Sequence, residues 1–117
     1  MSTVKAAVAS TTPSPALLED LVRRIRSVIE PKRIVLFGSA ARGTMGPDSD
    51  LDVLVIVQDG VHRLRTSQAI YRALSGVGHA KDIVVVTESD VAQDFRKLGT
   101  IITPALEEGR ELYSAAF

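Results

Sequence analysis

Two short hydrophobic runs, joined through small and acidic residues, constrain the fold of this chain more than any other feature. The first run, Ile34 to Phe37, leads into a Gly38-Ser39 turn. The second run, Val53 to Val57, begins directly after Asp50 and Asp52. Short apolar runs rich in β-branched residues are typical of buried strands. The pattern therefore predicts two strands of one sheet, with the aspartates at the rim of that sheet.

Helical and extended patterns alternate along the rest of the chain, which predicts a layered α/β or α+β domain. Residues 1–15 are rich in Ser, Thr, Ala and Pro and are expected to form a flexible leader, followed by one domain over 16–117. We expect helices over 17–29, 64–74 and 88–98, short helices after residues 40 and 105, strands over 33–37, 50–57 and 82–86, and a short terminal strand at 112–113.

Composition excludes several classes of protein. The 117 residues are enough for a single core, and 45% of them are hydrophobic. Lys plus Arg equal Asp plus Glu at 14 each, so no basic field favours direct nucleic-acid binding. The absence of cysteine excludes disulfides and thiolate metal sites. No apolar run approaches the length of about 18 residues that spans a membrane, and no signal-peptide core stands out, so we expect a cytoplasmic location.

Three aspartates are the candidate metal ligands. Asp50 and Asp52 are two residues apart at the start of a strand, so both point to the same face. Asp82 has the same position on the next strand, directly before the apolar run 83–86. Each aspartate alone could simply end a strand as a solvated turn residue. If the strands are neighbours, however, three carboxylates converge, and their repulsion favours a divalent cation such as Mg²⁺.

The turn upstream of the aspartates is suited to holding phosphate. Gly38 has no Cβ to keep an anion away from the backbone N–H groups, and Ser39 adds a hydroxyl donor. Arg42, about one helical turn further on, could reach the same oxygens with its guanidinium. We therefore predict nucleotide binding by Gly38, Ser39 and Arg42.

These motifs resemble those of the nucleotidyltransferase superfamily of the DNA polymerase β type. Its pattern is Gly-Ser after a strand, then Asp-x-Asp, then a distant third Asp, matched here by Gly38-Ser39, Asp50-x-Asp52 and Asp82. The chain is most similar to the minimal nucleotidyltransferases, whose signature matches residues 38–43 and 49–52. The resemblance covers roughly Leu17 to Tyr113 and implies a short mixed sheet flanked by helices.

The resemblance also implies a reaction and a partner. Asp50 and Asp52 would bind two Mg²⁺ ions, and Asp82 would bind the ion that activates the acceptor hydroxyl. A nucleoside triphosphate, expected to be ATP, would donate AMP. Minimal nucleotidyltransferases are typically paired with a HEPN-domain protein as antitoxin and toxin, and the implied acceptor is a hydroxyl, plausibly of a tyrosine, on that partner.

Two other functions remain open at this point. The chain could be a non-enzymatic nucleotide-binding module that inhibits its partner by occlusion, or a transferase that modifies a small molecule such as an aminoglycoside. The intact set of aspartates favours an enzyme, because occlusion needs no clustered carboxylates. The absence of room for an acceptor-binding domain disfavours the small molecule. Tyr71 and Tyr113 could either pack or be modified, and the sequence does not decide between these roles.

Overall fold

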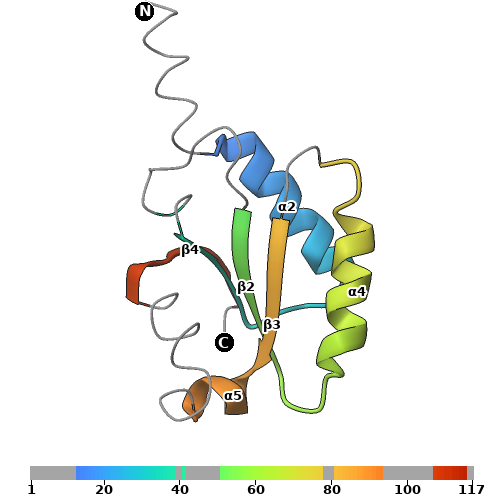
Figure 1. Cartoon of the computed structure of the whole chain (residues 1–117), viewed down its shortest axis with the longest axis vertical. Coiled ribbons are helices and arrows are strands. Elements are labelled where there is room, and N and C mark those ends of the chain that lie inside the picture. Colours follow the sequence, from blue (N-terminus) through green and yellow to red (C-terminus); the bar gives the residue numbers. More distant parts are fainter. Residues whose placement is uncertain (1–12, 39–40, 42–50, 78–80, 94–106, 116–117) are drawn as a thin grey trace, which may run out of the picture.

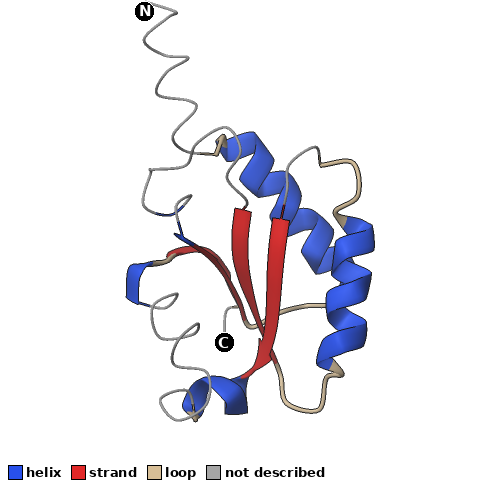
Figure 2. Ribbon diagram, in the orientation of Figure 1, coloured by secondary structure: helices blue, strands red, loops and turns tan. Residues whose placement is uncertain are grey.

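The computed structural model describes residues 13–38, 41, 51–77, 81–93 and 107–115. Both helices and strands are found in this part of the chain (Figure 2). In chain order the elements are α2 (Pro15–Val28), β1 (Arg33–Phe37), β2 (Leu51–Val57), α4 (Arg63–Ala73), β3 (Lys81–Thr87), α5 (Glu88–Ala92) and β4 (Arg110–Ser114).

The four strands form one mixed sheet in the order β3-β2-β1-β4. Strand β2 pairs parallel with β3, whereas β1 pairs antiparallel with both β2 and β4. The predicted mixed sheet flanked by helices is therefore confirmed. Six of the seven residues of β2 are buried, which agrees with its central place in the sheet.

The two faces of the sheet carry separate hydrophobic clusters. Helices α2 and α4 pack on one face, and this larger cluster includes Leu21, Ile25 and Ile70 from the helices. The other face carries a smaller cluster, to which Val91 of α5 adds partial cover. Along β2 the odd-numbered residues belong to the first cluster and Leu54 and Ile56 to the second. By strand alternation, Asp52 lies on the face of the smaller cluster.

Helix α2 begins two residues before the expected start, because its sequence supplies both a cap and a compatible first residue. The hydroxyl of Ser14 accepts a hydrogen bond from the backbone N–H of Leu17 at 3.1 Å. Pro15 occupies the first turn, where its missing N–H costs nothing. Residues 1–12 of the expected leader lie outside the described part of the chain, so its boundary stays a prediction.

The helix expected over 88–98 ends at Ala92 in the described part of the chain, and residues 94–98 lie outside that part. Helix α5 spans only Glu88–Ala92, with Gln93 at its C-cap. None of its residues is fully buried, so little packing energy favours extending it. Its start is fixed instead by polar contacts, since both carboxylate oxygens of Asp59 accept hydrogen bonds from Ser89, and these bonds lower the pKa of Asp59. The short helices expected after residues 40 and 105 lie largely outside the described residues.

A half-buried arginine fastens α2 to the end of α4. One Nη atom of Arg24 donates to the carbonyls of Ala73 and Ser75, each at 3.0 Å. Its Nε donates to Asp20 at 3.0 Å. The last carbonyls of a helix have no partner within the helix, so Arg24 satisfies groups that would otherwise need water. The two helices that cover the larger cluster are thereby held together by a charged hydrogen-bond donor.

We expect Arg24→Met to lower the free energy of unfolding by about 1–2 kcal/mol, because hydrogen bonds from a charged donor are lost while the aliphatic stem is kept. The matched control is Arg23→Met. Arg23 also pairs with Asp20, but its side chain is 73% exposed and makes no described bond to α4. Chemical denaturation of both variants measures the difference. An equal decrease in the free energy of unfolding for the two variants would contradict the assigned role of Arg24.

Candidate functional site

The described residues of the predicted site, Gly38, Asp52 and Asp82, lie at one end of the sheet. Strand β1 ends at Phe37, and because β2 runs antiparallel to it, β2 begins at the same end. Strand β3 runs parallel to β2 and also begins there. Figure 1 shows the first residues of β2 and β3 side by side at this end, with α5 at the opposite end of the sheet. Strand direction alone therefore places Gly38, which follows β1, at the same end of the sheet as Asp52 and Asp82, the second residues of β2 and β3.

Asp52 and Asp82 lie directly beside each other in the parallel ladder. They are Cα partners in the register of β2 and β3, so their side chains leave the same face of the sheet. Neighbouring strands are about 4.8 Å apart, and the Cα atoms of the two aspartates are separated by a distance of this order. Asp52 is half-buried and Asp82 is exposed. The second and third strands, whose adjacency the sequence left as a condition, are therefore neighbours in the sheet.

Gly38 lies against the carboxylate of Asp52. It directly follows β1 and has a φ of +71°, a conformation that L side chains rarely adopt. A Cβ atom at this position would lie 2.3 Å from Oδ2 of Asp52. Both the backbone conformation and the lack of space therefore require glycine here. The backbone at the turn therefore lies close to the Asp52 carboxylate, and phosphate binding by Gly38 stays a prediction.

The other predicted site residues lie outside the described part of the chain. These are Ser39, Arg42 and Asp50. Among the described residues no group of three or more His, Cys, Asp or Glu side chains is placed to hold a metal ion. Asp52 and Asp82 are thus the described pair of the three expected carboxylates, and the roles of all six residues remain predictions.

The chemistry of this pair fits a hard divalent cation. Two carboxylates in adjacent strand positions repel each other, by about 4 kcal/mol at 4 Å in a protein-surface environment. A cation between them replaces this repulsion with attraction, and Mg²⁺ takes carboxylate oxygens as ligands. The backbone at Gly38 lies close to the Asp52 carboxylate, so a cation held by the pair would lie near this turn.

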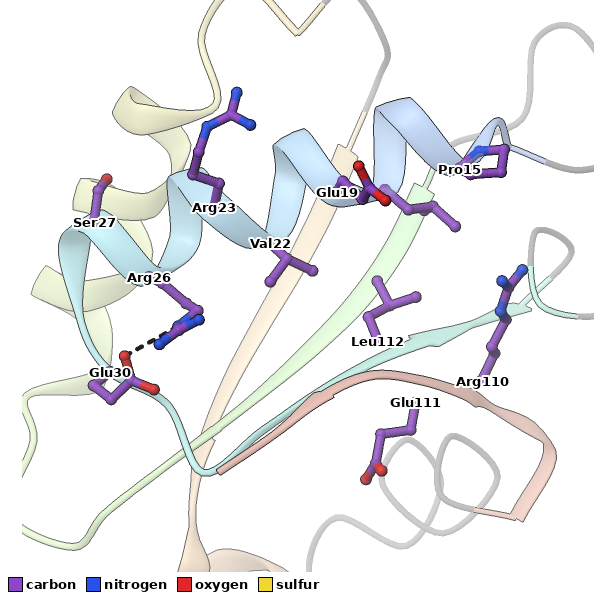
Figure 3. A pocket seen from close by; sticks show the side chains of 11 residues that line it. Pro15, Glu19, Val22, Arg23, Arg26, Ser27, Glu30, Arg110, Glu111 and Leu112 are labelled. Carbon is purple, nitrogen blue, oxygen red and sulfur yellow. Dashed lines mark hydrogen bonds and ion pairs between the residues drawn. The ribbon is translucent and has the colours of Figure 1, made fainter. Parts of the chain in front are cut away.

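A separate hollow of about 680 Å³ lies between α2 and β4 (Figure 3). Strand β4 is the edge opposite to β3, and α2 covers the face of the sheet opposite to Asp52. The hollow is therefore distinct from the carboxylate pair. Its lining mixes apolar side chains such as Val22 and Leu112 with both acidic and basic residues, and several of these are already paired, as Arg26 is with Glu30.

One contact near the site was not found from the sequence. The hydroxyl of Tyr71, on α4, accepts a hydrogen bond from the backbone N–H of Ile83, the residue after Asp82. No pattern in the sequence distinguishes this tyrosine from a packing residue.

The described helices do not include one long and apolar enough to cross a membrane.

We expect Gly38→Ala to destabilise the protein more than Gly60→Ala does. Both glycines have positive φ, so each substitution should cost about 1 kcal/mol of backbone strain. Only at Gly38 does the new methyl group meet an atom, and this overlap should add at least about 1 kcal/mol, since no atom lies within 4 Å of the corresponding Cβ at Gly60. Denaturation curves provide the measurement. Equal losses would show that the carboxylate of Asp52 does not lie against Gly38.

Comparison with known proteins agrees with this geometry. The model of the nucleotidyltransferase domain family matches residues 17–110. A candidate protein adenylyltransferase of Methanocaldococcus jannaschii is 31% identical over 71 residues, covering 59% of this chain and 71% of the relative.

Solved structures share the fold. A chain of a toxin–antitoxin crystal structure with AMP-PNP superposes with a TM-score of 0.66 at 19% identity, covering 84% of this chain and 73% of the other. A chain of the complex between a tri-AMPylated HEPN toxin of Shewanella oneidensis and its MNT antitoxin gives 0.58 at 18% identity, with 86% and 71% covered. The family match spans most of the chain and includes both described aspartates and Gly38. The chain therefore belongs to the nucleotidyltransferase domain family and is a nucleotidyltransferase.

Proposed function

We propose that this protein transfers AMP from ATP to a hydroxyl group of a partner protein, and that the partner is a HEPN-domain toxin for which this chain is the antitoxin. The observation that carries the proposal is the register pairing of Asp52 with Asp82 beside the close backbone of Gly38. A carboxylate pair beside a turn that has room only for glycine suits nucleotidyl transfer better than simple occlusion of a partner, which needs neither feature.

The residues of this chain have separate roles in the proposal. Asp52 and Asp82, together with Asp50, would hold two Mg²⁺ ions. When bound, these ions lower the pKa of the acceptor hydroxyl and neutralise charge on the leaving group. Gly38, Ser39 and Arg42 would hold the phosphates of ATP, through backbone N–H groups, a hydroxyl and a guanidinium.

The proposed reaction is a single displacement at phosphorus. The acceptor oxygen forms a bond to the α-phosphorus of ATP, the bond from that phosphorus to the bridging oxygen of pyrophosphate breaks, and the acceptor proton is released. The protein forms no covalent bond to the substrate in this reaction. Most of the rate enhancement therefore comes from holding the reactants in line and from stabilising charge. Use of ATP accords with the cytoplasmic location expected from the sequence.

The relatives support the choice of acceptor. The Methanocaldococcus jannaschii relative is named for protein adenylylation, and the Shewanella oneidensis complex contains a tri-AMPylated HEPN toxin bound to an MNT antitoxin. Because the carboxylate pair lies at the end of a short sheet, with Asp82 exposed, a docked protein could supply both a wall for the site and the attacking hydroxyl.

We expect Asp52→Asn and Asp82→Asn each to lower the rate of AMP transfer by at least about 100-fold, the scale for loss of a preorganised electrostatic group. Neither substitution should unfold the protein, because neither side chain is fully buried. Transfer is measured with labelled ATP and the partner protein, and folding is checked by circular dichroism.

The matched control is Glu111→Gln. Glu111 is a strand carboxylate on the far edge strand β4, where it pairs with Arg33 at 2.6 Å. The control should keep transfer within about 2-fold, since surface ion pairs contribute little. Unchanged transfer in Asp52→Asn would refute the proposed site.

A further prediction concerns the acceptor. The protein alone with ATP and Mg²⁺ should transfer little AMP, because water screens an open site. Addition of a HEPN-domain protein encoded beside it should produce a partner that is heavier by one or more AMP units in intact-mass spectra.

Two results would replace this proposal. A partner that binds tightly but gains no mass under varied nucleotides and metals would favour inhibition by occlusion. Modification of a small hydroxylated compound, without binding of the neighbouring protein, would favour the small-molecule transferase.

A further inference from the structure

Asp82 lies near the start of an edge strand, where backbone pairing is weakest. Among the described strands, whose order is β3-β2-β1-β4, strand β3 pairs only with β2. Asp82 is the second residue of β3, so only Lys81 precedes it within the strand. One side of the β3 backbone faces no strand, and such edges fray or pair with other chains unless something covers them. The position of Asp82 relative to Asp52 therefore depends on what holds this strand end.

A tyrosine from α4 binds the open side of β3 at this point. The backbone N–H of Ile83 donates a hydrogen bond of 2.9 Å to the hydroxyl of Tyr71. Its helix neighbour Ile70 is fully buried in the larger cluster, which fixes this turn of α4 against the sheet. Tyr71 is 41% exposed, so its side chain lies at the surface of the protein and not within the core.

The hydrogen bond acts close to Asp82. Alternate residues of a strand direct their backbone N–H groups to opposite sides. The N–H of Ile83 points to Tyr71, so that of Asp82 points toward β2. The nitrogen held by Tyr71 is two covalent bonds from the Cα atom of Asp82. Tyr71 thus replaces the missing strand at the peptide that joins Asp82 to Ile83.

We propose that Tyr71 is a positioning residue, whose hydroxyl holds the start of β3 in register so that the Asp82 carboxylate keeps the separation from Asp52 that a shared divalent cation requires. This inference rests on the proposed function, because it assumes that the two aspartates hold a metal ion together. Tyr71 itself need not touch the metal or the nucleotide. Its effect passes through the backbone of Ile83.

The test compares the two tyrosines of the chain. Tyr71→Phe keeps the ring and removes only the hydroxyl. Tyr113→Phe is the matched control, because its hydroxyl donates to Glu30 and it lies on β4, the opposite edge of the sheet. Two properties of the full-length protein are measured besides transfer. They are amide hydrogen exchange of residues 81–84 by NMR, and Mn²⁺ binding by electron paramagnetic resonance, with Mn²⁺ as the probe for oxygen ligands.

For Tyr71→Phe we expect amide exchange at Ile83 to rise at least about 10-fold and the dissociation constant of Mn²⁺ to rise about 10-fold, the scale for loss of a group that orients a metal ligand. Tyr113→Phe should change neither property. Unchanged exchange, or faster exchange with unchanged Mn²⁺ affinity, overturns the positioning role.

Asp82→Asn separates this inference from the proposed function. If Asp82→Asn leaves Mn²⁺ binding unchanged, the proposed metal site is wrong, and the positioning role is wrong with it. If Asp82→Asn weakens Mn²⁺ binding but Tyr71→Phe does not, only the role of Tyr71 is wrong. If Tyr71→Phe does not fold, amide exchange is measured in the unmodified protein instead. The amide of Ile83, which faces the open edge, should then be protected from exchange. Rapid exchange at this amide overturns the inference.

Discussion

The register between β2 and β3 is the constraint on which the rest of the structure depends. It pairs Asp52 with Asp82 and, in the same ladder, Val53 with Ile83. A slip of one residue would move one aspartate to the other face and would carry the apolar residues of β3 out of their clusters. Because Val53 and Ile83 are both buried in the larger cluster, the packing that stabilises the domain also fixes the spacing of the two carboxylates.

Polar contacts then hold the elements around this register. Arg24 joins α2 to the end of α4, and α4 in turn presents the hydroxyl of Tyr71 to the edge of β3. On the other side of β2, the antiparallel pairing of Phe37 with Asp52 brings the turn at Gly38 onto the carboxylate. The pair of aspartates thus has Gly38, which has no space for a Cβ, on one side. On the other side lies the edge of β3, which Tyr71 holds.

Much of the fold could be predicted from residue patterns, because strong local signals coincide with burial. The run Val53 to Val57 is apolar on both faces and lies in an interior strand. Asp52 and Asp82, which have equivalent positions before apolar runs, are paired in neighbouring strands, an adjacency that the sequence left as a condition. Strand order and direction depend on long-range pairing, which has no local signal. Of the helix expected over 88–98, α5 forms only Glu88–Ala92, and it buries none of its residues, while residues 94–98 lie outside the described part of the chain. The contact between Tyr71 and Ile83 depends on how α4 sits on the sheet, and therefore has no counterpart in the sequence.

The most direct test of the account is a crystal structure of the protein with Mn²⁺ and a non-hydrolysable ATP analogue, with the metal located by its anomalous scattering. We expect an anomalous peak between Asp52 and Asp82, with carboxylate oxygens of both residues at about 2.2 Å from the ion and the analogue phosphates beside Gly38. A peak that contacts neither aspartate, or phosphates bound at the hollow between α2 and β4, would contradict the assignment of this end of the sheet as the active site.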